Sequence, residues 1–519
     1  MKKKQFITLC YILLSFASFA QVNWTYFSEE PILSMDPEVS WGAYGQPTVI
    51  IHNDTIKMWY AVAETGEFDP VVRGRIHYAW SIDGFTWTKH QDNPVLDVGG
   101  TEEWDGEWLD TPGILWDGTE FKLYYYGDST YSQGQDNTAI GLATSPDGIN
   151  WTRQGIVLEM GEPDEWDGHH IELPAVHYVS ENGLYAMLYS GMDRANYPAP
   201  GFIQIGLALS FDGYDWVKWP DNPVVEYGSY PSWNDIGVGG TAFIETDGIF
   251  EMWYTGIQIV EEPYSSWDSL KVGYAVTLNG TNWIQYPGNP VLTANPGDST
   301  VFWAFDIIWD ESDDLYKMYF ESHHWHYQDP YDPDTTHAIN AIFYATAPRT
   351  VMFSPDCNIS VSDDITINQG DNTQLQASGG DFYQWEPPDG LSNTDIPNPV
   401  ASPDETTTYR VLIVSETCIT KAEVTVTVEE SSFTESGSFE NISIYPNPLN
   451  NSSVIKTDRI LNKASVTITN SLGQVVFYED NISGNEIVID RADLKTGMYF
   501  YEIKKEDNSI LSKGKLIIE

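Results

Sequence analysis

A twelve-residue pattern recurs along the first two thirds of the chain and limits its fold more than any other feature. Its first copy is Ile76-His-Tyr-Ala-Trp-Ser-Ile-Asp-Gly-Phe-Thr-Trp87, and it returns at 140–151, 205–216 and 272–283, with a shortened copy at 342–348. The alanine common to all copies stands at 79, 143, 208, 275 and 345, so the intervals are 64, 65, 67 and 70 residues. Such a period predicts an array of equivalent structural units.

Each copy predicts a β-hairpin, because a run of alternating residues leads to an Asp-Gly or Asn-Gly turn and then to a Trp-bearing strand. About half a period earlier a second hairpin recurs, whose strands 58–60, 123–125, 187–189, 252–254 and 318–320 have the pattern Met/Leu-x-Tyr/Phe. Two hairpins make a four-stranded antiparallel sheet. We therefore predict an all-β fold with a five-bladed β-propeller over 21–352.

The fifth unit stops after Pro348, without its turn and its last strand. The missing strand has a counterpart near the N-terminus, where 23–33 is similar to 85–96. We expect the N-terminal segment to supply the outer strand of blade five. This pairing would close the ring and remove an open sheet edge.

The charge balance and the first twenty residues indicate the compartment. With 25 Lys and Arg against 76 Asp and Glu, the net charge is −51, which argues against nucleic acid as a partner. Residues 1–20 have a basic start, a short apolar run and a small-x-small end, and predict a secretory signal peptide with no transmembrane segment after its removal. In an exported chain, Cys357 and Cys418 are expected to form a disulfide.

Two further β-domains are predicted beyond the propeller. Residues 353–430 resemble the immunoglobulin-like or PKD-like β-sandwiches of exported Bacteroidetes proteins, with Trp385 as the central core residue. A polar linker is expected at 431–442. Motifs at 444–448, 466–476, 494–501 and 513–518 resemble the type A C-terminal sorting domain of the type IX secretion system, which covers 443–519. This resemblance implies the secretion machinery as a partner and a secreted or cell-surface location.

One mouth of the propeller channel is expected to collect polar side chains. These residues come just before the inner strand or just after the second strand of each blade, whereas the Asp-Gly turns lie at the other end. The set comprises Gln46, Glu64, Asp110, Asp128, His169, His170, Glu172, Asp193, Arg194, Asp235, Trp303, Asp306, Glu321, His323, His324 and His326. Carboxylates that converge from different blades suit glycoside hydrolysis by acid/base catalysis.

At these residues the chain resembles the five-bladed propeller glycosidases of families 32, 43, 62 and 68 and, more loosely, family 130. The family 43 pattern implies a base on blade one, a modulating Asp on blade two and an acid Glu before a Pro on blade three. Glu172 fits the acid and Asp110 the modulator. The base is missing because Gln46 precedes the blade-one proline, and Asp36 is a substitute. Substrate binding is expected of Gln46, His169, His170, Arg194, Asp235, Trp303, Asp306 and His324.

The sequence thus predicts an exported, monomeric glycoside hydrolase that acts on plant or algal polysaccharide or oligosaccharide. Three alternatives stay open: phosphorolysis as in family 130, a non-catalytic glycan-binding propeller, which Gln46 favours, and an adhesin. No cofactor is required by this reading. The histidines would allow zinc and the carboxylates calcium, although their spacing matches no common metal site.

Overall fold

The computed structural model describes residues 24–27, 30–34, 43–65, 71–130, 138–180, 182–193, 202–258, 270–293, 302, 304–328, 336–349, 352–353, 357–429, 442–470, 473–491, 494–507 and 509–518, without the side chains of 43–44, 65, 323–328, 336–340 and 459. The chain divides into two compact units, Met1–Val428 and Glu429–Glu519. The predicted signal peptide and residues 431–441 of the predicted linker lie outside the described residues, and Ile442 begins a strand.

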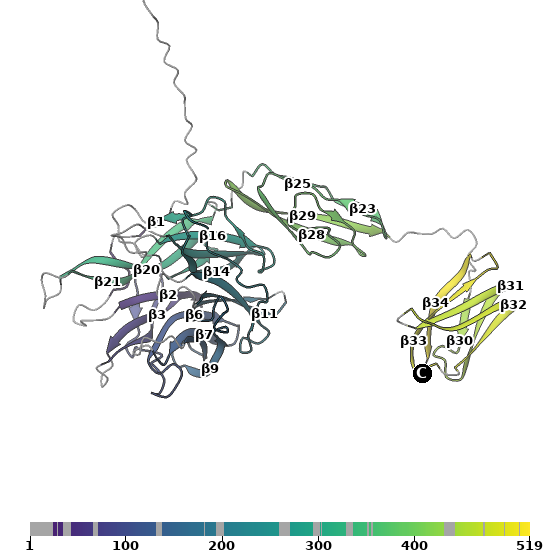
Figure 1. The fold of residues 1–519 in the computed structure, drawn as a ribbon, viewed down its shortest axis with the longest axis horizontal. Coiled ribbons are helices and arrows are strands. Elements are labelled where there is room, and N and C mark those ends of the chain that lie inside the picture. The colour runs from purple at the N-terminus through teal and green to yellow at the C-terminus, as the bar shows by residue number, and fades with distance from the viewer. Residues whose placement is uncertain are drawn as a thin grey trace, which may run out of the picture. The chain divides into compact units, whose positions relative to one another are not determined.

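The first unit begins with five antiparallel four-stranded blades around a channel, as the repeat predicts (Figure 1). Within blades one to four the strands follow chain order from the channel outward. Blade one comprises β2 (Ala43–His52), β3 (Thr55–Thr65), β4 (Val72–Ser81) and β5 (Thr88–Lys89), and blade two comprises β6 (Trp108–Trp116), β7 (Phe121–Asp128), β8 (Thr138–Ser145) and β9 (Thr152–Glu159).

The other three blades repeat this order. Blade three comprises β10 (His170–Val179), β11 (Leu184–Met192), β12 (Ile203–Ser210) and β13 (Val217–Lys218). Blade four comprises β14 (Gly237–Thr246), β15 (Ile249–Ile257), β16 (Lys271–Thr277) and β17 (Ile284–Gln285), and β18 (Leu292–Thr293) also pairs with β16. Blade five has β19 (Phe305–Asp310), β20 (Leu315–Gln328) and β21 (Thr336–Pro348).

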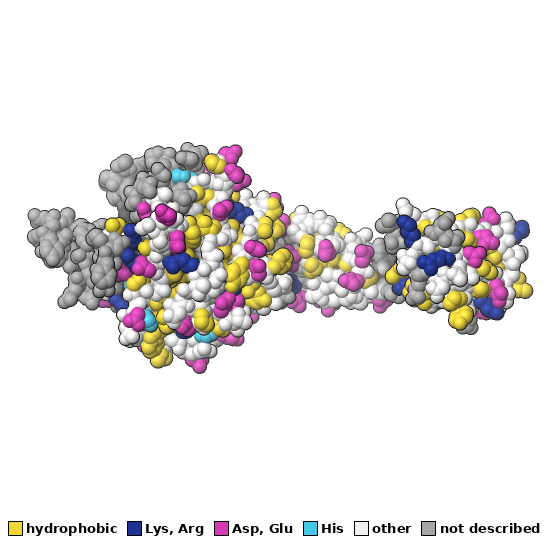
Figure 2. Space-filling model, turned by 90° about the horizontal axis from the view of Figure 1, so that it is seen from below, with side chains coloured by type: hydrophobic (Ala, Val, Ile, Leu, Met, Phe, Trp, Pro, Cys, Tyr) yellow, Lys and Arg dark blue, Asp and Glu magenta, His cyan; other side chains and the backbone are white. Residues whose placement is uncertain are grey.

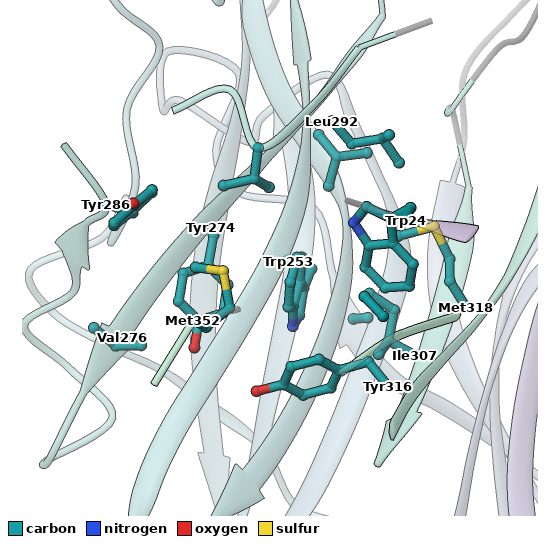
Figure 3. Close-up of a cluster of buried hydrophobic side chains, with 14 of the residues drawn as sticks. Trp24, Trp253, Tyr274, Val276, Tyr286, Leu292, Ile307, Tyr316, Met318 and Met352 are labelled. Atoms are coloured by element: carbon teal, nitrogen blue, oxygen red, sulfur yellow. The ribbon is translucent and has the colours of Figure 1, made fainter. Parts of the chain in front are cut away.

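The outer strand of blade five comes from the N-terminal segment, which confirms the predicted closure. Strand β1 (Thr25–Tyr26) pairs antiparallel with β21, with Thr25 opposite Thr346. Next to β1, the indole of Trp24 is buried in a hydrophobic cluster of blades four and five and packs edge-to-face on Trp253, with ring centroids 5.5 Å apart (Figure 3). The ring is therefore joined by backbone pairing and by a buried aromatic contact.

A tryptophan fills a slot between the strands of each of the three middle blades. Trp104, Trp166 and Trp233 each lie against two glycines on neighbouring strands, and a Cβ at Gly127 would come within 2.3 Å of the Trp104 ring. The following residue reinforces two of the slots: Asp105 Oδ2 accepts hydrogen bonds from the Tyr125 hydroxyl and Arg153 Nε, both at 2.9 Å. These glycines are needed because the indole occupies their side-chain space.

A small β-domain follows the propeller within the first unit. Its main sheet contains β23 (Ile365–Asn368), β29 (Cys418–Glu429), β28 (Thr407–Ser415) and β26 (Phe382–Glu386), and two strand pairs are β22 (Ser360–Val361) with β25 (Ala377–Ser378) and β24 (Thr373–Gln374) with β27 (Val400–Ala401). Trp385 is fully buried in its core, as predicted. A disulfide joins Cys357 and Cys418, which are 61 residues apart.

This β-domain is bound to the turn of blade four. The Gln384 side-chain oxygen accepts a hydrogen bond from the Leu278 amide at 2.6 Å, and its nitrogen donates to the Asn282 carbonyl at 2.7 Å. Asn279, which replaces the aspartate of the other turns, donates to Glu386 Oε1 at 2.7 Å. An aspartate at position 279 would instead face another carboxylate.

The second unit is a five-stranded sheet with its own core around Val466, Ile468 and Ile503. Its strands are β30 (Ile442–Tyr445), β31 (Ser452–Asn470), β32 (Val475–Asp490), β33 (Gly497–Lys504) and β34 (Ile510–Ile518). Among the described residues, no helix is long and apolar enough to cross a membrane.

On the face drawn in Figure 2, acidic side chains are scattered and do not gather into one patch.

Candidate functional site

The inner strands of blades one to four carry a bulge at the same place, near the channel mouth. The register between the first and second strands shifts there, and the residue at the shift has a positive φ: Gln46 at 53°, Thr111 at 40°, Leu173 at 55° and Gly240 at 58°. The residue just before the bulge still pairs with the second strand. These residues are Gly45 opposite Ala61, Asp110 opposite Tyr126, Glu172 opposite Ser190 and Gly239 opposite Thr255.

This register corrects the alignment made from sequence. Gln46 is equivalent to Thr111 and Leu173, and the blade-one equivalent of Asp110 and Glu172 is Gly45. Pro47, Pro112 and Pro174 occupy equivalent places, but the sequence alignment takes the residue one before the proline in blade one and the residue two before it in blades two and three. Blade one therefore has no side chain of its own at the position from which blades two and three present carboxylates.

Gln46 connects two blades. Its side-chain oxygen accepts a hydrogen bond from the Thr111 amide at 2.9 Å, and Thr111 Oγ1 accepts one from the Leu173 amide at 3.1 Å. The bulge residues thus form a chain of hydrogen bonds from blade one to blade three. The Gln46 oxygen is occupied by this contact in the structure.

Asp110 is held by two donors and has a raised pKa. Its Oδ2 accepts a hydrogen bond from Trp108 Nε1 at 3.1 Å, and its Oδ1 accepts one from the Thr111 amide at 2.9 Å. The pKa of Asp110 is raised to about 7, chiefly by burial and to a smaller extent by the nearby charge of Glu172, against the effect of the two donors. The carboxyl therefore exchanges its proton near neutral pH.

Glu172 lies beside a histidine on the same face of β10. Its Oε2 is 3.4 Å from His170 Nε2, and the Glu172 side chain is 15% exposed. The His170 ring lies 5.4 Å from the Tyr126 ring, and the Tyr126 hydroxyl donates to Asp128 Oδ2 at 3.2 Å. The negative charges of Asp128, Glu172 and Asp110 raise the pKa of Tyr126 in addition to its burial, which places all three carboxylates around this phenol.

Asp306 lines the channel below the mouth and joins blade five to blade one. Its Oδ2 accepts hydrogen bonds from the Val49 amide at 2.7 Å and the Thr48 hydroxyl at 3.1 Å. Burial raises its pKa to about 7. The channel holds a cavity of about 110 Å³ that is lined by all five inner strands.

A residue that sequence reasoning missed is His77 of blade one. Its Nε2 lies 2.8 Å from Glu64 Oε1, and the residue is 7% exposed. A sequence signal was present: His77 stands in the recurring pattern where the next three copies have Gly141, Gly206 and Gly273. In blade one the imidazole thus occupies the place where the middle blades accommodate tryptophan.

Comparisons with known proteins agree with this architecture. Residues 443–519 match the family described as "Secretion system C-terminal sorting domain". A 1,2-beta-oligomannan phosphorylase of Thermoanaerobacter sp. is 27% identical over 236 residues, which are 44% of this chain and 70% of that protein. The invertase of Kluyveromyces lactis is 23% identical over 245 residues, 42% of this chain but only 34% of the invertase.

Two solved structures have similar chains. A structure of a glycoside hydrolase from Parabacteroides distasonis is 15% identical, has a TM-score of 0.48 and covers 65% of this chain and all of its own. A family 130 structure, from work on hydrolases that target β-1,2-mannosidic linkages in Candida mannan, is 14% identical with a TM-score of 0.45, over 64% of this chain and 96% of that one.

The chain is a homologue of glycosidases and of a glycoside phosphorylase. Its sorting domain shows that this propeller glycosidase homologue is secreted across the outer membrane or to the cell surface.

The remaining predicted site residues of this glycosidase homologue are partly described. Asp235 is buried, and its charge opposes the lowering of the Lys271 pKa that burial causes. The His169 amide donates to the Met192 carbonyl at 3.0 Å. Asp36, Arg194 and Trp303 lie outside the described residues, as does the side chain of His324. Across the described part of the chain, no group of three His, Cys, Asp or Glu side chains is arranged to hold a metal ion.

Proposed function

We propose that this protein is an exported glycoside hydrolase in which Glu172 and Asp110 carry the acid chemistry at the propeller mouth. The observation that supports it is their equivalence: both leave the inner strand at the same position of neighbouring blades, and the charge of Glu172 contributes to the raised pKa of Asp110. A carboxyl beside another carboxylate favours its protonated form.

The two residues differ in their surroundings, which suggests separate roles. Asp110 accepts two hydrogen bonds and is fixed in place, so its role is to hold a proton and to modulate the acidity of the two carboxyl groups. Glu172 has a side chain that is 15% exposed and lies beside His170, so it delivers the proton to the glycosidic oxygen. Plant or algal polysaccharides and their oligosaccharides are the proposed substrates, and the domain boundaries given above are part of this proposal.

Hydrolysis is favoured over phosphorolysis by the described arginines. Phosphate binding needs cationic donors that are available to the ligand. Arg75 is 3% exposed, bonds to Asp97 at 2.6 Å and donates to the Glu64 carbonyl at 2.6 Å. Arg73 donates to the Gly106 carbonyl at 3.1 Å. Both guanidinium groups thus donate hydrogen bonds to acceptors of the protein itself.

The first experiment is a screen of the purified protein against aryl glycosides and plant and algal polysaccharides, with and without phosphate. Release of a sugar that does not depend on phosphate supports hydrolysis. Glu172→Gln should then lower kcat by about 10²- to 10⁴-fold while sugar binding is retained. Glu245→Gln is the matched control, because Glu245 pairs with His177 at 3.0 Å at the other end of these blades. An unchanged rate in Glu172→Gln refutes the assignment.

A second candidate function is glycan binding without catalysis. Gly45 favours it, because blade one lacks a carboxylate of its own. Retardation of the protein on a polysaccharide affinity gel, with no sugar released from any substrate, would establish this alternative.

A further inference from the structure

The space that a blade-one side chain would occupy at the mouth is not empty. A Cβ added at Gly45 would lie 2.6 Å from Glu321 Oε2 and 2.9 Å from Glu321 Cδ. Since Gly45 is the register equivalent of Asp110 and Glu172, that Cβ direction is the one along which those two carboxylates leave their strands. A third carboxylate therefore lies where blade one has none of its own.

Glu321 reaches this place from blade five, the neighbour of blade one across the ring closure. Its amide donates to the Ala304 carbonyl at 3.0 Å, and it pairs with Ile342 on β21, so its backbone is fixed on both sides. The residue is 6% exposed. Burial of a carboxylate is costly unless it is paired or hydrogen-bonded, and the Glu321 carboxyl group is held against the backbone of Gly45 on the inner strand of blade one.

Gly45 is a glycine because of this carboxylate, since its backbone does not demand one. Its φ lies outside the left-handed range in which glycine is favoured, and the three closest atoms to the added Cβ all belong to the Glu321 carboxyl group. Blade one therefore has no side chain at position 45, and the adjacent blade five supplies the Glu321 carboxylate at that place.

We propose that Glu321 is the general base of the reaction, supplied by blade five at the blade-one position. This assignment rests on the proposed function. The Glu321 carboxylate takes a proton from water as the water oxygen bonds to the anomeric carbon. The bond from that carbon to the leaving oxygen breaks, and the leaving oxygen takes the proton of Glu172. Both carboxyls then regain their starting states by exchange with solvent.

The blade positions favour water as the nucleophile. The Glu321 carboxylate lies at the Gly45 position of blade one, and Glu172 belongs to blade three, so the blade of Asp110 separates the two positions. A separation that admits water between base and acid gives inversion at the anomeric carbon. We expect the first product released to have the inverted configuration, as proton NMR would record.

The primary test is Glu321→Gln, which keeps the size of the side chain and removes its basicity. We expect kcat to fall by about 10²- to 10⁴-fold, with KM changed by less than roughly threefold and the thermal unfolding curve unchanged. Azide or formate should restore turnover to Glu321→Ala but not to Glu172→Ala. A Glu321→Gln variant with kcat close to that of the wild type would overturn the assignment.

A second variant moves the carboxylate to blade one. Gly45→Asp alone places its Cβ against Glu321 and should reduce activity. In the Glu321→Ala background that space is free, so the double variant Gly45→Asp/Glu321→Ala should exceed Glu321→Ala in kcat by about tenfold or more. If neither small anions nor Gly45→Asp raise the rate of Glu321→Ala, Glu321 has a structural role only and the inference is wrong.

These outcomes are separable from the proposed function. Activity in the wild type that is lost in Glu172→Gln but kept in Glu321→Gln rejects Glu321 as the base and leaves the glycosidase assignment intact. A wild-type protein without activity on any substrate refutes the proposed function, and with it this role of Glu321.

Discussion

Asp306 should make the stability of the propeller depend on pH in an unusual direction. Its pKa is raised from 3.8 to about 7 because it is buried between blades five and one. In the folded protein the protonated form is favoured, so this stability contribution is complete below about pH 4 and is lost as pH rises to about 7. Most carboxylates in proteins act the other way.

The magnitude follows from the shift. About three pKa units correspond to about 4 kcal/mol between the acid and alkaline limits. Between pH 5 and pH 8 the loss is about 2 to 3 kcal/mol, because part of it has already occurred at pH 5. Asp306→Asn removes this titration. The free energy of unfolding of the variant relative to the wild type should therefore rise by that amount from pH 5 to pH 8.

Tryptophan fluorescence during thermal or urea unfolding measures this directly, because every tryptophan except Trp385 precedes residue 353. Asp310→Asn is the control on the same strand: Lys317 and other donors lower the pKa of Asp310, so its removal should destabilise equally at pH 5 and pH 8. Parallel pH profiles for the wild type and Asp306→Asn would refute the reasoning.

Three further perturbations test other contacts. Asn279→Asp should place a second carboxylate against Glu386 and weaken the docking of the β-domain by about 1–3 kcal/mol, with recovery at low pH in calorimetry. Gly127→Ala should force its new methyl group into the Trp104 ring and cost the propeller about 1–3 kcal/mol, seen as a lower Tm. Cys418→Ser should destabilise the β-domain by about 4 kcal/mol, seen as an earlier calorimetric transition; unchanged curves would contradict each expectation.

The blades could be predicted because the residues that determine each hairpin lie close together in the sequence. Alternating residues and an Asp-Gly turn such as that at Asp83 specify a hairpin within about twelve residues, and the period repeats it. The closing strand was also predictable, since 23–33 keeps the pattern of an outer strand. The Trp slots have a sequence signal of their own, the repeated Glu-Trp-Asp-Gly at 103–106 and 165–168.

The mouth could be predicted only in part. Asp110 and Glu172 were identified because a proline follows each within two residues. The bulge leaves no mark in composition, so the sequence does not show that the residue two before the proline is the equivalent one in every blade, and the blade-one position is predicted at Gln46 instead of Gly45. Glu321 is predicted as a mouth residue, but its contact with Gly45 depends on β20 and β2, which lie close in space and far apart in the sequence.

The ring closure has a consequence for how the protein is made. Because Thr25 pairs with Thr346, the last blade is finished only after more than three hundred residues have emerged. Until then β1 has no partner strand, and β21, once made, presents an unpaired edge that invites association with other chains until β1 docks. Joining such distant segments also carries the entropic cost of a long loop. The propeller is therefore completed when β1, the first of its strands to be made, pairs with β21. The segment that contains β1 must still be free to pair after export. An N-terminal fusion next to Trp24 should therefore compromise the fold.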